Sequence, residues 1–196
     1  MSEILVSFIP TVLVVGAVGL VLRVRKGRNK ARSLKGAFYI FVLLVFSYSS
    51  WLSYLQYKIW AGNELGRYFL PEYQVGYFYF YSFTLFFLPY LLSFILGALF
   101  IYLLTKLNNS RDKTLFEDEE PYIAGLFMFL SGYPGILIYF VSILAVYLLW
   151  HIVEMFRGAK DVRLPLYYLW PIAALLMILV WRSSFVRSDI WLLLKI

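Results

Sequence analysis

Residues 121–156, PYIAGLFMFLSGYPGILIYFVSILAVYLLWHIVEMF, decide how this chain folds. The stretch is apolar and 36 residues long, whereas one membrane-spanning helix needs roughly 20 residues. Within it, Ser131-Gly132-Tyr133-Pro134-Gly135 carries the glycine and proline signals of a tight turn. The sequence therefore predicts a short helix over about 121–132, a turn, and a full span over about 135–155. The short helix must be sheltered by protein, or the bilayer must thin around it.

Four further stretches are apolar and contain no Asp, Glu, Lys or Arg: 4–22, 37–57, 76–105 and 164–181. Hydrophobic residues make up 62% of the 196-residue chain and its mean hydropathy is +0.77. A soluble fold of this size cannot bury that much apolar surface, so the solvent must be lipid. We expect an all-α integral membrane protein with six transmembrane segments, one of them short, forming a single domain over 1–196. The tail after Trp181 alternates charged and bulky apolar residues and is typical of an interfacial segment.

The basic residues indicate which loops face the cytoplasm. The first loop is densely basic, with Arg23, Arg25, Lys26, Arg28, Lys30, Arg32 and Lys35, and cytoplasmic loops carry such an excess. The loop around 58–72 is balanced in charge and is expected outside. If 121–156 crosses twice, the basic loop with Arg157, Lys160 and Arg163 also lies in the cytoplasm. The predicted location is the plasma membrane, with both termini outside.

Several functional classes are disfavoured by composition. The chain has no cysteine, so disulfides, thiolate metal sites, iron–sulfur clusters and cysteine nucleophiles are excluded. It has no phosphate-binding loop, Gly-x-Ser-x-Gly or His-Glu-x-x-His motif, and we expect no cofactor. The net charge of +7 lies in short loops, where it meets lipid headgroups, so nucleic acid is not an expected partner. The start of the chain lacks the features of a cleaved signal, which predicts a retained first helix.

Few polar groups are expected at membrane depth, and an ion-coupled transporter usually keeps some there. His151 and Glu154 lie three residues apart on one helix face, and Arg157 follows three residues later. They are weak candidates for a metal site, because one histidine and one carboxylate do not complete one; an ion-paired ladder is the simpler interpretation.

Two further patterns suit helix packing or the membrane interface. Serines over 47–53 favour hydrogen bonds between helices. The stretch GYFYFYSFTLFF, 76–87, is typical of an aromatic belt at the membrane interface, although it could also face a partner.

The densest charge lies directly before the short helix. Glu117, Asp118, Glu119 and Glu120 precede Pro121. Carboxylates followed by proline suit the positive end of a helix dipole, so the motif predicts a helix start. Four adjacent acids also repel each other, which raises the pKa of at least one of them.

Residues 95–149, followed by RLPLYYLWPIAALL at 163–176, resemble the second half of the prepilin peptidases, intramembrane aspartyl proteases similar to preflagellin peptidases. In that family a Gly-x-Gly-Asp motif opens a short helix after a basic loop. The resemblance places Glu120 at the second catalytic aspartate, without either glycine. In SYLQYKIW, 53–60, Tyr54 stands at the first aspartate. Both catalytic aspartates are thus replaced, and tyrosine cannot act as the base of a two-carboxyl mechanism at neutral pH.

Three functions follow as hypotheses. The first is a non-catalytic relative of these peptidases that binds single-helix substrates or helps assemble them. The second is an accessory subunit of a larger respiratory or secretory membrane complex. The third is an active enzyme that uses the acidic cluster, with Glu120, Asp118 and Tyr54 as candidate catalytic residues. The expected partners are membrane lipids and other membrane proteins.

Overall fold

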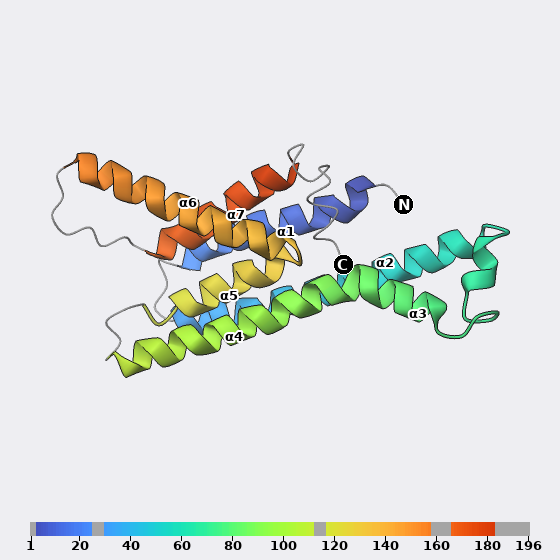
Figure 1. Cartoon of the computed structure of the whole chain (residues 1–196). Coiled ribbons are helices and arrows are strands. Elements are labelled where there is room, and N and C mark those ends of the chain that lie inside the picture. Colours follow the sequence, from blue (N-terminus) through green and yellow to red (C-terminus); the bar gives the residue numbers. More distant parts are fainter. Residues whose placement is uncertain (1–2, 25–29, 112–116, 158–165, 183–196) are drawn as a thin grey trace.

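The computed structural model describes residues 3–24, 30–111, 117–157 and 166–182, and these residues are helical apart from short turns (Figure 1). The elements in chain order are α1 (Glu3–Val24), α2 (Lys30–Ala61), the 3-10 turn η1 (Gly66–Phe69), α3 (Tyr77–Ser82), the π-helical turn η2 (Phe83–Phe87), α4 (Leu88–Ser110), α5 (Glu120–Ser131), α6 (Gly135–Phe156) and α7 (Leu166–Arg182). Each predicted helical segment is confirmed as helix, including the division of 121–156 into two helices. The predicted interfacial tail lies outside the described residues.

Among the described residues, three helices are long and apolar enough to cross a membrane. They are Lys30–Ala61, the continuous run Tyr77–Ser110 and Gly135–Phe156, with 32, 34 and 22 residues. Shorter apolar helical stretches occupy Pro10–Val24 in α1 and Tyr167–Val180 in α7. Helix α5 has 12 residues, about 18 Å at 1.5 Å per residue, which is well below the thickness of the hydrocarbon core.

The ends of most helices gather at one side of the molecule, which we call the basic end. There α1, α4 and α6 end and α2, α5 and α7 begin (left in Figure 1). Arg23, Lys30, Arg32, Arg111 and Arg157 lie in these terminal turns. At the other side α2 and α3 extend beyond the remaining helices and are joined through η1 (Figure 1).

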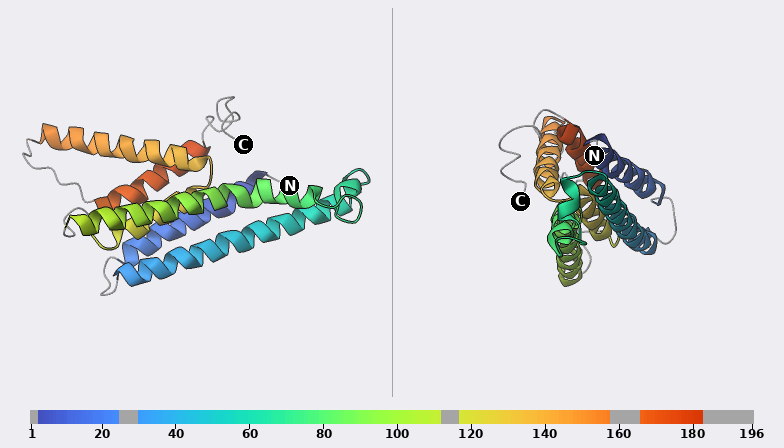
Figure 2. Two further views of the ribbon diagram at one scale, coloured as in Figure 1. Left: turned by 60° about the horizontal axis from the view of Figure 1, so that its bottom comes forward. Right: turned by 90° about the vertical axis from the view of Figure 1, so that its right-hand side faces the viewer.

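Helix α5 is the centre of the fold. It packs most extensively on α4 and also contacts α1, α2, α6 and α7 (Figure 2). Of its residues only Tyr122 is not fully buried. Gly97 of α4 and Gly125 of α5 bring the two backbones close, because a Cβ on Gly97 would lie 2.9 Å from the Gly125 carbonyl oxygen. Small residues allow such close packing of membrane helices.

The turn after α5 is fixed to α4. Gly132 adopts φ +61°, a conformation that glycine reaches without steric cost. The next residue, Tyr133, donates its N–H to the Pro89 carbonyl at 3.0 Å. Helix α5 therefore ends beside the first turn of α4, part-way along the continuous run Tyr77–Ser110, and α6 returns toward the basic end.

One of the serines over 47–53 and several aromatic residues join helices at the far end of α2, whereas Ser50 and Ser53 bond to carbonyls within α2. Ser49 Oγ donates to the carbonyl of Phe86 in η2 at 3.0 Å, which joins α2 to the third apolar segment. Beyond it, Trp60 packs against Phe69 and Tyr77. The aromatic stretch thus contributes to an intramolecular cluster between α2 and α3.

Candidate functional site

The acidic cluster passes from the surface into the protein within four residues. Glu117 and Asp118 are exposed, whereas Glu119 and Glu120 are 7% and 5% exposed. Pro121 lies in the first turn, as the sequence predicts. The N-cap residue Glu119, however, makes no side-chain capping hydrogen bond. Its carboxylate is directed elsewhere.

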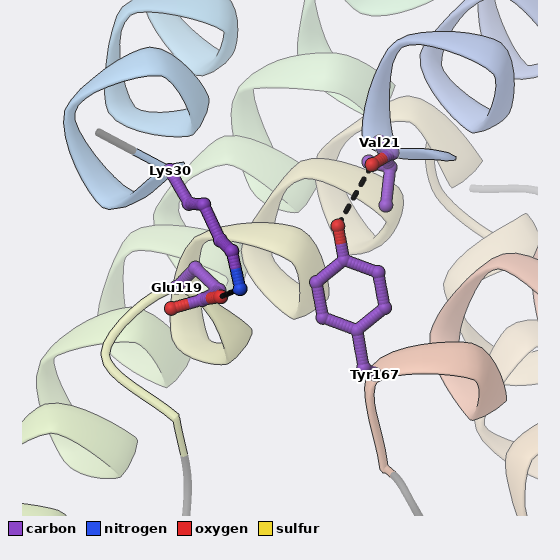
Figure 3. A network of polar contacts seen from close by, with 4 residues as sticks. All are labelled: Val21, Lys30, Glu119 and Tyr167. Atoms are coloured by element: carbon purple, nitrogen blue, oxygen red, sulfur yellow. Dashed lines mark hydrogen bonds and ion pairs between the residues drawn. The ribbon is translucent and has the colours of Figure 1, made fainter. Parts of the chain in front are cut away.

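Glu119 faces the start of α2. Lys30 Nζ lies 3.2 Å from Glu119 Oε1 (Figure 3). The Glu119 side chain is 9% exposed and that of Lys30 is 34% exposed. Although the distance is short, Glu119 Oε1 has no hydrogen bond of acceptable geometry within the described residues. The contact is therefore a charge pair that fixes the start of α5 to α2.

The side chain of Glu120, the first residue of α5, faces α7. Burial, followed by the negative charges of Glu117 and Glu119, raises the pKa of Glu120 to about 7, although backbone hydrogen bonds at Glu117 and Tyr167 oppose the rise. Its Oε2 atom is buried and makes no hydrogen bond within the described residues. The prediction that crowding raises the pKa of one acid is confirmed, but burial is the largest cause.

Tyr167 closes the site from the opposite side. Its hydroxyl donates to the carbonyl oxygen of Val21 at 2.7 Å, which joins the start of α7 to the end of α1 (Figure 3). Tyr167 is 5% exposed. The site therefore combines side chains from α2, α5 and α7 with the backbone of α1, all at the basic end.

Tyr54 is not part of this site. The resemblance that places Tyr54 and Glu120 at the two catalytic aspartates implies that they lie close together, and this prediction is wrong. It follows Lys30 by 24 residues in one unbroken helix, a separation of about 36 Å. Tyr54 is 53% exposed, and the ammonium of Lys58 lies 4.9 Å from the centre of its ring. The replaced-dyad geometry inferred from the resemblance is therefore not formed by these two residues.

His151 and Glu154 lie on the last turns of α6. Glu154 pairs with Arg157 at 3.2 Å, which confirms that part of the ion-paired ladder. His151 stacks on Tyr147, with ring centroids 6.3 Å apart. Among the described residues, no group of three or more His, Cys, Asp or Glu side chains gathers in a way that could hold a metal ion.

Sequence reasoning missed two residues of the site, Lys30 and Tyr167. Lys30 was counted only as one of the basic residues that orient the chain. The excess of basic residues does predict that the loop around 23–35 and the loop around 106–120 lie on the same side of the membrane, which places Lys30 on the side of Glu119. Tyr167 gave no signal, because a tyrosine in an apolar helix is ordinary.

No family model, curated protein or solved structure matches this chain.

Chemically, the site offers one carboxyl group that can exchange a proton near neutral pH. Glu119 is held by a lysine, whereas Glu120 faces α7. A dyad mechanism requires two carboxyls that share a proton. Here two neighbouring carboxyls have different partners on different helices, so the geometry favours charge recognition or proton binding over a shared-proton dyad.

Proposed function

We propose that the chain is a non-catalytic membrane protein, resembling the prepilin-type peptidases, that binds the single membrane helix of another protein. In this proposal it crosses the plasma membrane six times, with the basic end in the cytoplasm and the N-terminus outside. The start of α5 then lies at the cytoplasmic membrane edge. Exposed Glu117 and Asp118 present negative charge there, which suits a partner with a basic segment beside its membrane helix.

The observation that carries the proposal is that the two buried glutamates at the start of α5 face different helices, Glu119 toward α2 and Glu120 toward α7. Glu119 pairs with Lys30, and the buried Oε2 atom of Glu120 has no hydrogen-bond partner among the described residues. This arrangement retains a structured acidic site and lacks the paired carboxyls that peptide hydrolysis by the dyad needs. Binding without cleavage is therefore the function that the geometry supports best.

The test uses the full chain in proteoliposomes with a synthetic probe. The probe has one apolar 20-residue helix flanked by four lysines, and its matched form has four glutamines. We expect the lysine probe to be retained more strongly than the glutamine probe, and to remain intact by mass spectrometry. Glu117→Gln should weaken that preference. Glu64→Gln, an exposed acid of the distant α2–α3 connection, is the charge-matched control and should leave it unchanged.

One observation favours a second candidate, an active peptidase. The pKa of Glu120 near 7 suits a general acid or base at neutral pH. Cleavage of the lysine probe that is lost in Glu120→Gln would establish this candidate and overturn the first. If neither probe is retained and the protein purifies only with fixed partners, the accessory-subunit hypothesis replaces both.

A further inference from the structure

Helix α6 lies at the edge of the bundle. It packs on α7 and α5 near its beginning, and the distance between α6 and α7 increases toward its end (Figure 2). From Tyr147 to Arg157 every side chain except that of Glu154 is exposed. The second half of this membrane-length helix therefore has little packing against the other described residues.

The two faces of α6 differ in a regular way. Ile136, Tyr139 and Ser142 are buried against the bundle. At 100° per residue, the opposite face carries residues spaced by four and three in alternation. This face, which we call the α6 seam, consists of Leu137, Val141, Leu144, Leu148, His151 and Met155. Alternating steps of four and three are the heptad spacing by which two helices pack along their full length.

His151 is the exception to the apolar character of the seam. It is exposed, although it belongs to a helix that is apolar enough to cross a membrane. Ionisable side chains in such helices almost always face protein or a water-filled cavity, because contact with lipid is costly. An exposed histidine in the second half of this apolar heptad face therefore points to protein as the missing neighbour.

We propose that the α6 seam binds the α6 seam of a second copy of this chain, in a parallel pair about a two-fold axis normal to the membrane. All copies of one membrane protein share an orientation, so each seam residue meets its own counterpart at the same depth. His151 then meets His151 of the second copy, where one neutral imidazole donates and the other accepts. A different partner would have to supply a polar group at that depth.

Charge and area both fit a second copy. Glu154 and Arg157 neutralise each other within the helix, so a parallel pair brings together no uncompensated charge. The apolar seam residues are 42–65% exposed, and the flanking Phe140 and Tyr147 are 37% and 44% exposed. Because these side chains are roughly half exposed, the face offers on the order of 700 Å², close to the roughly 800 Å² per partner of a stable interface.

The absence of cysteine from the chain allows a direct test by single-cysteine cross-linking. Leu148→Cys lies in the seam and Leu149→Cys lies about 100° away, yet these leucines are similarly exposed, at 58% and 62%. Leu43→Cys in α2, at 68% exposure, is a second control. The full-length variants are oxidised in membranes with copper phenanthroline, and dimer formation is followed on non-reducing gels.

We expect Leu148→Cys to form the disulfide dimer on the order of tenfold faster than either control, because the bond forms only when the Cα atoms approach within about 7 Å. Leu144→Cys, the adjacent seam position, should behave like Leu148→Cys and replaces it if that variant is not inserted. Equal rates at 148 and 149 would indicate random collision and overturn the proposal. The absence of cross-links at both seam positions would overturn it as well. Neither result bears on probe binding at the acidic site.

Discussion

Replacing Gly97 with alanine should destabilise the protein because α4 and α5 are in backbone contact at this position. The new Cβ would lie 2.9 Å from the Gly125 carbonyl oxygen, closer than a carbon and a carbonyl oxygen normally approach. No side-chain rotation relieves a clash with backbone, so α5 must move away from α4. Overpacking of this kind costs about 1–3 kcal/mol, while alanine recovers up to about 1 kcal/mol of helix propensity.

Gly125→Ala tests the same contact from the opposite helix. Its Cβ would overlap the end of the Ile101 side chain, and it would lie 3.1 Å from the Gly97 carbonyl oxygen. Ile101 is only partly buried, so its side chain can be shortened without opening the core. We therefore expect Ile101→Ala to restore most of the stability lost in Gly125→Ala and none of that lost in Gly97→Ala.

The assay is thermal unfolding of the purified protein in nanodiscs, followed by circular dichroism. For a chain of this size, 1 kcal/mol corresponds to about 2–4 °C in Tm, so a net loss of 1–2 kcal/mol lowers Tm by about 2–8 °C. Gly36→Ala is the matched control, because a Cβ there would have no atom within 4 Å. If Gly97→Ala melts at the temperature of Gly36→Ala, the proposed backbone contact does not exist.

Three further predictions concern polar groups. Mainly through burial, the pKa of Glu120 rises from 4.5 to about 7 in the folded protein. The protonated side chain therefore contributes its whole stabilisation below about pH 4.5, and this contribution is lost as the pH rises through 7. Glu120→Gln should therefore make Tm less dependent on pH between about pH 5 and 8. Lys30→Met leaves Glu119 buried and unpaired and should cost on the order of 1–3 kcal/mol; adding Glu119→Gln should recover most of the loss in Tm. Ser49→Ala breaks a bond between helices and should cost about 0.6 kcal/mol and at most about 1.7 in the same assay, whereas Ser50→Ala, which breaks only a bond within α2, should leave Tm unchanged.

The helices could be predicted because their signals are local. A turn signal at 131–135 divided the longest apolar stretch, and the structure begins α6 at Gly135. Pro121 marked the start of α5, which the structure places at Glu120. Charged residues marked the limits of the remaining segments less closely: α2 begins at Lys30 and ends at Ala61, well beyond the predicted 37–57. Lysines and arginines in its first turns extend the helix into the interface, where apolarity alone gives no signal.

The partner of Glu120 could not be read from local spacing, and the choice of Tyr54 shows why. Tyr54 was selected by its position in a short motif, although charge had already oriented the second segment from the basic loop outward. That orientation places Tyr54 near the far end of α2 and Glu120 near the basic end. The predicted topology therefore already excluded Tyr54 as a neighbour of Glu120. For two candidate catalytic residues, the first test is whether both lie on the same side of the membrane.

The same charges that orient the chain also explain how a helix as short as α5 is held inside it. Its apolar body is enclosed by other helices, so its length need not match the bilayer. Its beginning is attached to α2 by Lys30 and Glu119, and its end is attached to α4 by the Tyr133 backbone. Because the ion pair with Lys30 replaces solvation that Glu119 loses on burial, Glu119 can lie inside the bundle only beside a basic residue. Glu119 and the basic end are therefore one structural feature, and a partner that competes for Lys30 or supplies its own cation would act on the position of α5.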